Sequence, residues 1–178
     1  MSMLRKSGDR GYSDLFSGER ISKNSARLEA LGDLDELGSV LAVARHHARH
    51  PSTKKRILNI QQDLFVLGTE LATTDNRKKI SSQGVDKPFL VLFEKTIEAL
   101  YQNTSIPPGF IIPGDSLSAA YLHLARTVAR RCERRVVRLY ELKQMTNVNI
   151  LSWLNRLSVY LYLLVIQEEK KLRLVKRL

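Results

Sequence analysis

The sequence has few of the residues that mark several common protein classes. Its single cysteine, Cys132, excludes an intramolecular disulfide framework and any zinc site built from several thiolates. The first residues, MSMLRKSGDRG, contain no apolar run that could act as a signal peptide. The most apolar stretch, Ser158 to Ile166, is far too short to cross a bilayer. We therefore expect a cytoplasmic protein with no membrane association.

The composition is that of a soluble globular protein with an excess of positive charge. The chain has 178 residues, of which 43% are hydrophobic and 26% charged, and this length predicts one domain over residues 1–178. Within it we distinguish a polar lead-in, residues 1–25, from a helical part, residues 26–175. Lys and Arg number 29 against 18 Asp and Glu, a net charge of +11 that favours a polyanionic partner.

Apolar residues recur with helical spacing over most of the chain. The clearest stripe has apolar residues three and four positions apart: Ile57, Ile60, Leu64, Leu67 and Leu71. Similar patterns predict helices over residues 26–49, over 89–101, from about 116, and from about 147 to the C-terminus. No segment alternates with the period of a strand, and residues 74–87 indicate a loop. The prediction is an all-α, five-helix up-and-down bundle of ferritin-like appearance, preceded by an ordered N-terminal loop.

The helix that begins near residue 116 has unusually many arginines. Four polar residues fall within a sector of roughly 100° on a helical projection: Arg126, Arg130, Glu133 and Arg134. Arg131, Arg135 and Arg138 fall on the other flank of its apolar stripe. Like charges at this spacing repel one another, so the face is either solvated or neutralised by an anion or a neighbouring subunit. Arginine suits bidentate binding of phosphate oxygens.

Three further segments could carry chemistry. The lead-in string KSGDRGYS combines glycines, hydroxyls and a lysine, which suits either phosphate binding or an ordinary turn, although no P-loop pattern is present. Asp33, Asp35 and Glu36 could form a metal pair, a solvated face, or partners for the arginine helix. Asn155 lies in an apolar helix, so we expect a buried amide that makes a core hydrogen bond or binds a ligand. His46 and His50 lack a nearby carboxylate, and we predict no metal-ligating residues.

In order along the chain, several motifs resemble one known family. The segments KSGDRGYSDLFSGERISK, ALGDLDELGS, NIQQDLFVLGTELAT, GFIIPGDSLSAAYLHLARTVARRCERRVV and LNRLS are similar to those of the PduO-type ATP:cob(I)alamin adenosyltransferases. The string R-x-x-x-R-R-x-E-R followed by N-R-L-S is the most specific. The resemblance implies a homotrimer with active sites between subunits. It also implies transfer of the 5′-deoxyadenosyl group of ATP, with Mg²⁺, to the cobalt of cob(I)alamin or a related reduced corrinoid, which forms adenosylcobalamin and triphosphate.

The resemblance also implies roles for individual residues. The ATP contacts it implies are Lys6, Ser7, Gly8, Ser13, Lys23, Arg130, Arg131, Glu133, Arg134 and Asn155. On the corrinoid side it implies an intersubunit salt bridge between Arg126 and Asp35, and places Phe110 against the lower face of the corrin. Of these residues, we expect Arg130, Glu133, Arg126 and Asp35 to act in catalysis.

Two other functions are weighed against this one. Val159 and Asp14 depart from the family's pattern, which motivates a non-catalytic nucleotide or corrinoid carrier of the same fold. A nucleic-acid-binding protein would suit the net charge. However, Glu133 interrupts the arginine face and stacking aromatics are missing from it, so we expect no nucleic-acid partner. The partners to expect instead are a corrinoid reductase and an adenosylcobalamin-dependent enzyme.

Overall fold

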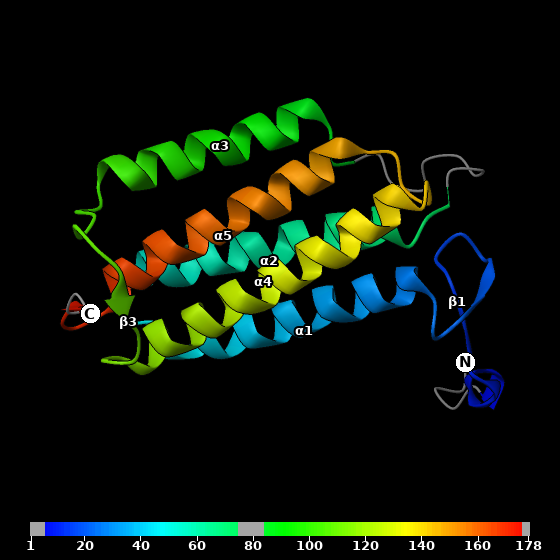
Figure 1. Cartoon of the computed structure of the whole chain (residues 1–178), viewed down its shortest axis with the longest axis horizontal. Coiled ribbons are helices and arrows are strands. Elements are labelled where there is room, and N and C mark those ends of the chain that lie inside the picture. Colours follow the sequence, from blue (N-terminus) through cyan, green and yellow to red (C-terminus); the bar gives the residue numbers. More distant parts are fainter. Residues whose placement is uncertain (1–5, 75–83, 176–178) are drawn as a thin grey trace.

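The protein is a bundle of five long helices, described here from a computed structural model that covers residues 6–74 and 84–175. Consecutive helices run in opposite directions, as Figure 1 shows. The elements in chain order are a 3₁₀ helix (Lys6–Arg10), β1 (Tyr12–Asp14), β2 (Arg20–Ser22), α1 (Ala26–His47), α2 (Pro51–Leu71), α3 (Lys87–Gln102), β3 (Ile111–Ile112), α4 (Leu117–Glu141), α5 (Val148–Glu168) and β4 (Arg173–Leu174). The predicted fold class and the number of helices are confirmed.

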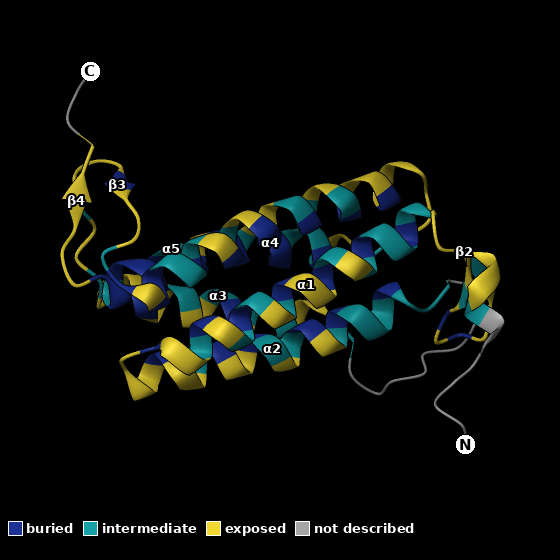
Figure 2. Ribbon diagram, turned by 90° about the horizontal axis from the view of Figure 1, so that it is seen from below, coloured by how far each residue is buried: buried dark blue, intermediate teal, exposed yellow. Residues whose placement is uncertain are grey.

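The helices pack in the order α2, α1, α4, α5, α3, so that α4 lies between α1 and α5. Figure 2 shows α1 and α2 side by side, with their exposed residues on the outer surface. The stripe predicted for α2, from Ile57 to Leu71, is buried. In α5, Trp153 stacks on Phe93 of α3 with ring centroids 4.8 Å apart. The core therefore runs the length of the bundle and holds α4 on both sides.

Side-chain caps define where four helices begin. The Ser25 hydroxyl accepts a hydrogen bond from Leu28 N at the start of α1, and the Ser116 hydroxyl accepts one from Ala119 N at the start of α4. The Asp86 carboxylate caps α3 in the same way, and Asn147 caps α5. These caps satisfy backbone donors that the first helical turn leaves unpaired. Pro51 begins α2, where a missing N–H has no cost.

The helix α5 is both the most apolar and the most buried element. By length and composition alone its 21 residues could cross a membrane. The apolar stretch Ser158 to Ile166, which is too short to do so, is only one part of this helix. In the structure, however, most of this helix is buried in the bundle. Its apolar character is thus explained by its contacts with α3 and α4.

The prediction that the last helix continues to the C-terminus was wrong, because α5 ends at Glu168 and residues 169–175 are not helical. The side chain of Glu168 is fully buried, and its carboxylate accepts hydrogen bonds from Arg49 N and His50 N at 2.8 and 3.2 Å. This contact fixes the end of α5, after which the chain becomes extended and pairs as β4 with β3. The lead-in also has more structure than predicted, because β1 and β2 form a hairpin. Most of the predicted loop at 74–87 lies outside the described residues.

The carboxyl group of Asp63 on α2 should make the stability of the folded protein depend on pH. Burial raises the pKa of Asp63 to about 6, whereas an unfolded aspartate titrates near pH 3.9. Between these pH values the folded protein keeps a proton that the unfolded chain releases, so the contribution of Asp63 to stability falls as the pH rises from about 4 to 6. We expect Asp63→Asn to melt at a higher temperature than the wild type at pH 7.5, with the difference vanishing near pH 4. An equal difference at both pH values would contradict this, and Glu98→Gln, at an exposed site, is the control.

Candidate functional site

Four of the predicted site residues form one cluster on α4 and α5. The Asn155 side-chain amide donates a hydrogen bond of 3.0 Å to the Glu133 carboxylate. One turn apart on α4, the Arg134 guanidinium donates to the backbone oxygen of Arg130 at 3.1 Å. Asn155 is exposed rather than buried, because it lies at the outer edge of α5 beside Glu133, so the expectation of a buried amide was wrong. We call Arg130, Glu133, Arg134 and Asn155 the arginine cluster.

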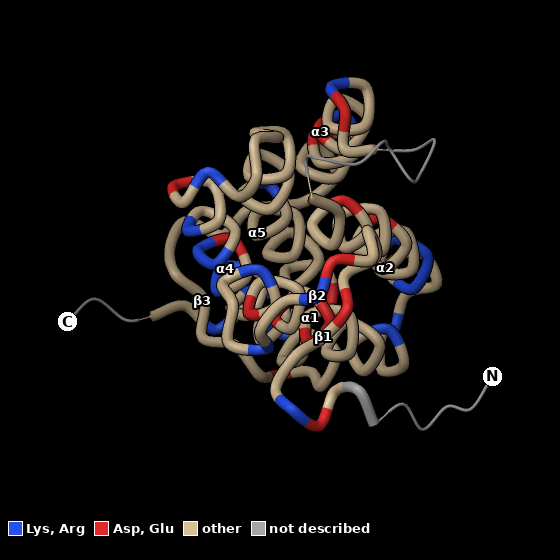
Figure 3. The backbone as a smooth tube through the Cα atoms, turned by 90° about the vertical axis from the view of Figure 1, so that its right-hand side faces the viewer, with Lys and Arg blue, Asp and Glu red and all other residues tan. Residues whose placement is uncertain are grey.

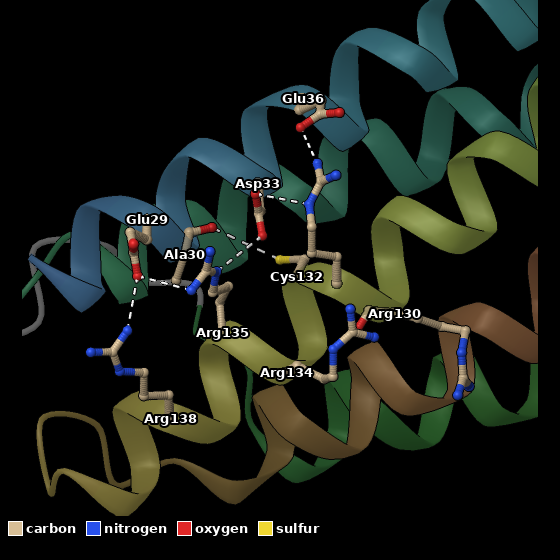
Figure 4. Close-up of polar contacts among 10 residues, drawn as sticks. Glu29, Ala30, Asp33, Glu36, Arg130, Cys132, Arg134, Arg135 and Arg138 are labelled. Carbon is tan, nitrogen blue, oxygen red and sulfur yellow. Dashed lines mark hydrogen bonds and ion pairs between the residues drawn. The ribbon is translucent and has the colours of Figure 1, made fainter. Parts of the chain in front are cut away.

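The arginines on the other flank of α4 are neutralised by α1. Arg131 pairs with Asp33 at 3.2 Å and also with Glu36. Arg135 and Arg138 both reach Glu29, at 3.1 and 3.2 Å. Figure 4 shows Arg135 and Arg138 turned toward α1, with Arg130 and Arg134 on the side of α5. Of the alternatives for the α1 carboxylates, Asp33 and Glu36 are therefore partners for the arginine helix.

This division of the arginines leaves unbalanced positive charge in the arginine cluster. In Figure 3 basic residues lie along α4, and others lie on α2 and α3. In the described parts of the chain, neither Arg130 nor Arg134 makes an ion pair with a carboxylate, and both are exposed. A bound anion would relieve their repulsion, and guanidinium groups match phosphate oxygens in geometry. Arg131, also predicted as a nucleotide contact, is held on the α1 side instead; its contact with the nucleotide stays a prediction.

The lead-in brings other predicted ATP contacts close together. A Cβ atom at Gly8 would lie 3.3 Å from the Lys23 ammonium, so the glycine allows this approach. Gly11 has a φ of 78°, in the region that favours glycine, and its carbonyl accepts a 2.8 Å hydrogen bond from Lys23 N. Ser13 pairs with Ile21 across the hairpin. Lys6 and Ser7 lie in the 3₁₀ helix, but their side chains are outside the described residues.

A groove between α1 and α2 contains Asp35. The groove has a hollow of about 520 Å³, mostly apolar, whose lining includes Asp35, Phe16 and Phe65. The exposed fraction of Phe65 is 79%, which is high for an aromatic side chain. Sequence reasoning missed Phe16 and Phe65. Phe65 falls outside the apolar stripe of α2, and an aromatic residue in that position is a signal that could have identified it.

Within the described part of one chain, the three residues predicted for the corrinoid side make no hydrogen bond or ion pair with one another. Asp35 is on α1, and Arg126 is on α4, where its Nε atom is buried without a hydrogen-bond partner in the described structure. Phe110 precedes β3 and is 85% exposed. In Figure 1 the lead-in and β3 lie at opposite ends of the bundle. The lead-in also packs on the α2 side, through Phe16, whereas the arginine cluster lies on the α5 side of α4.

The described residues give little support to a reactive cysteine or to a metal site. Burial raises the pKa of Cys132 to about 12, and its thiol faces the Ala30 carbonyl, so it is an inert core residue. Over residues 6–74 and 84–175 no group of three or more His, Cys, Asp or Glu side chains is arranged to hold a metal ion. Beside Arg126, burial and the arginine's charge lower the pKa of His123, which favours a neutral imidazole.

The fold and the arginine cluster together define a helical-bundle protein with an exposed, positively charged face on α4. Comparison with known proteins specifies the family: the family model described as cobalamin adenosyltransferase matches residues 3–168. The chain belongs to the cobalamin adenosyltransferase family. The resemblance stated from the motifs is confirmed.

Individual relatives agree with this assignment. The corrinoid adenosyltransferase PduO of Citrobacter freundii is 36% identical over 171 residues, which cover 95% of this chain and 50% of that protein. The chain thus spans about half the length of this relative. A corrinoid adenosyltransferase of Bacillus subtilis (strain 168) is 36% identical, with 91% of this chain and 83% of that protein covered. A variant PduO-type ATP:corrinoid adenosyltransferase from Lactobacillus reuteri, complexed with cobalamin and ATP, has a TM-score of 0.87 at 28% identity and covers 99% of this chain and 100% of that one.

The two flanks of α4 should respond differently to loss of an arginine. Arg131→Gln removes the ion pairs to Asp33 and Glu36, and we expect it to lower the free energy of unfolding by about 1 kcal/mol. Arg130→Gln removes no such pair and should change it by less than about 0.5 kcal/mol. Urea unfolding followed by circular dichroism measures both values. Equal losses would mean that the ion pairs to α1 contribute nothing specific.

Proposed function

We propose that the protein transfers the 5′-deoxyadenosyl group of ATP to cob(I)alamin or a related reduced corrinoid. The observation that carries this proposal is the arginine cluster, in which two arginines that pair with no carboxylate of the described residues flank an ordered Glu133–Asn155 pair. It occurs in a chain of the cobalamin adenosyltransferase family, whose relatives are named corrinoid adenosyltransferases. The similar structure complexed with cobalamin and ATP supports both ligands.

In this reaction the cobalt(I) centre of the substrate attacks C5′ of ATP. A cobalt–carbon bond forms with the electron pair of the metal, the C5′–oxygen bond breaks, and triphosphate leaves. No side chain has to act as the nucleophile. The protein must orient C5′ toward the cobalt and stabilise the negative charge that grows on the leaving triphosphate.

The described residues match these tasks. Arg130 and Arg134 offer guanidinium donors to the polyphosphate, and Glu133, oriented by Asn155, fixes the position of the cluster. The lead-in adds the Lys23 ammonium and the backbone around Gly8, with Ser13 nearby on β1. Asn155 contacts one carboxylate oxygen of Glu133, so the other oxygen could bind a metal ion. In proteins, Mg²⁺ bound to phosphates is commonly also coordinated by one or two carboxylates. Mg²⁺ held there would neutralise part of the triphosphate charge.

We further propose that the active site is shared between subunits of a homotrimer. Within one chain, the lead-in and Asp35 face the α2 side, whereas the arginine cluster faces the α5 side. The buried Nε of Arg126 and the exposed Asp35 carboxylate would then pair across the boundary, with Phe110 beside the lower face of the corrin. The cytoplasmic location stays a prediction, as do the reductase and the adenosylcobalamin-dependent enzyme as partners.

The activity is tested by anaerobic incubation with ATP, Mg²⁺ and chemically reduced cob(I)alamin, followed by visible spectroscopy. We expect adenosylcobalamin to form, and Arg130→Ala to slow its formation by about 10²-fold or more, because phosphate positioning and charge stabilisation are lost. Lys95→Ala, at an exposed site on α3, is the control. Binding of ATP to the wild type without any cobalt–carbon bond would leave the non-catalytic carrier as the better explanation.

Sharing of the site between chains is tested by mixing two inactive variants. Lys23→Ala removes a lead-in contact, and Arg130→Ala removes a cluster contact. If each site takes its lead-in from one chain and its cluster from the next, random mixed trimers have about a quarter of their sites intact. We expect refolded mixtures to recover about that share of activity. Mixtures no more active than the separate variants would place both residues in the same chain's site.

A further inference from the structure

The groove between α1 and α2 continues into a second hollow of different character. This hollow has a volume of about 500 Å³ and is lined by Arg45, His46, Lys54 and Lys55, with Ala42 and Leu58. Ala42 also lines the apolar hollow that contains Asp35, so the two adjoin. Arg45 lies about 15 Å beyond Asp35 along α1. We call this second hollow the basic pocket.

Within the described residues, the charge of the basic pocket is not balanced. None of the described residues that line it is acidic. In the parts of the chain covered by the structure, Arg45, Lys54 and Lys55 make no ion pair, unlike the arginines on the inner flank of α4. Lys54 and Lys55 also lie near the N-terminus of α2, where the helix dipole disfavours cations. The arrangement therefore costs stability, and a bound anion would offset that cost.

The chemistry of the substrate in the proposed function suggests which anion this is. In a cob(I)alamin the corrin ligand carries one negative charge and cobalt(I) one positive charge, so the ring is neutral overall. The amide side chains of the ring are also neutral. The single remaining formal charge lies on the phosphodiester of the nucleotide tail, which is freed from the cobalt when the lower axial base is displaced. An apolar groove followed by a cationic pocket matches an uncharged ring followed by an anionic tail.

We propose that the basic pocket binds the phosphodiester of the nucleotide tail of a complete corrinoid, while the ring lies in the adjoining apolar groove. This inference rests on the proposed function. It assigns to Arg45, His46, Lys54 and Lys55 the recognition of a tail-bearing substrate, with Asp35, Phe16 and Phe65 near the ring. The other source of phosphate oxygens, ATP or the tripolyphosphate product, is distinguished by the experiment.

The test compares two corrinoids in the Lys54→Gln/Lys55→Gln variant. Cobalamin has the nucleotide tail, whereas cobinamide has the same ring without the tail or its phosphodiester. We expect the KM for cob(I)alamin to rise about tenfold, because charge-assisted contacts to the phosphodiester are lost. The KM for reduced cobinamide, the KM for ATP and kcat should stay unchanged. Lys87→Gln/Lys95→Gln on α3 loses the same charge at exposed sites and should alter none of these values.

Each other outcome overturns the proposal. An equal rise in KM for both corrinoids would mean that the pocket supports the ring or the fold. A higher KM for ATP, or weaker inhibition by tripolyphosphate, would assign the pocket to the nucleotide, and unchanged constants would leave the pocket without a role. Arg45→Gln should repeat the cobalamin-specific effect if the double variant folds poorly. A wild type that makes no adenosylated product refutes the proposed function instead, and equilibrium binding of cobalamin against cobinamide then tests the pocket alone.

Discussion

The contact between α1 and α4 determines how the rest of the protein is arranged. Beneath it, small apolar side chains such as Ala30 and Cys132 are fully buried and allow the helices to approach closely. Above it, Arg131, Arg135 and Arg138 are held by carboxylates of α1. Exposed ion pairs contribute little stability each, so the buried seam supplies most of the free energy. The ion pairs instead favour one rotation of α4 about its axis, and that rotation turns the arginine cluster outward beside α5.

The arginines of α4 thus form two groups, one on each flank of the helix. One flank is neutralised within the chain and contributes to the structure. The other flank keeps its charge available, because α5 presents Asn155 to it rather than a carboxylate in the described residues, and Glu133 belongs to α4 itself. The same contrast recurs on the outer surface of α1 and α2, where the hollow that holds the cations near Ala42 is lined by no acidic residue among those described. In this protein the basic residues that lack an acidic partner among the described residues indicate binding sites better than the total number of basic residues does.

Much of the fold could be predicted from the sequence, because helical periodicity is a local property. The buried stripe of α2 and the common face of Arg130, Glu133 and Arg134 follow from spacing alone. The end of α5 does not, since it depends on contacts of Glu168 with backbone donors distant in sequence, at Arg49 and His50. The groove beside Asp35 could not be predicted either, because a hollow depends on how two helices pack. The motif resemblance named the corrinoid, which spacing could not do.

The strand pair β3–β4 connects two parts of the chain that are made at different times. Val175 N donates a hydrogen bond to the Phe110 carbonyl at 2.8 Å, and Arg173 pairs with Asp115 at the same distance. During synthesis on the ribosome, the segment around Phe110 is made long before these partners. It can reach its final conformation only after the last residues of the described chain have emerged. The Phe110 segment thus completes its pairing only after α5 has been translated, although its own residues precede α4.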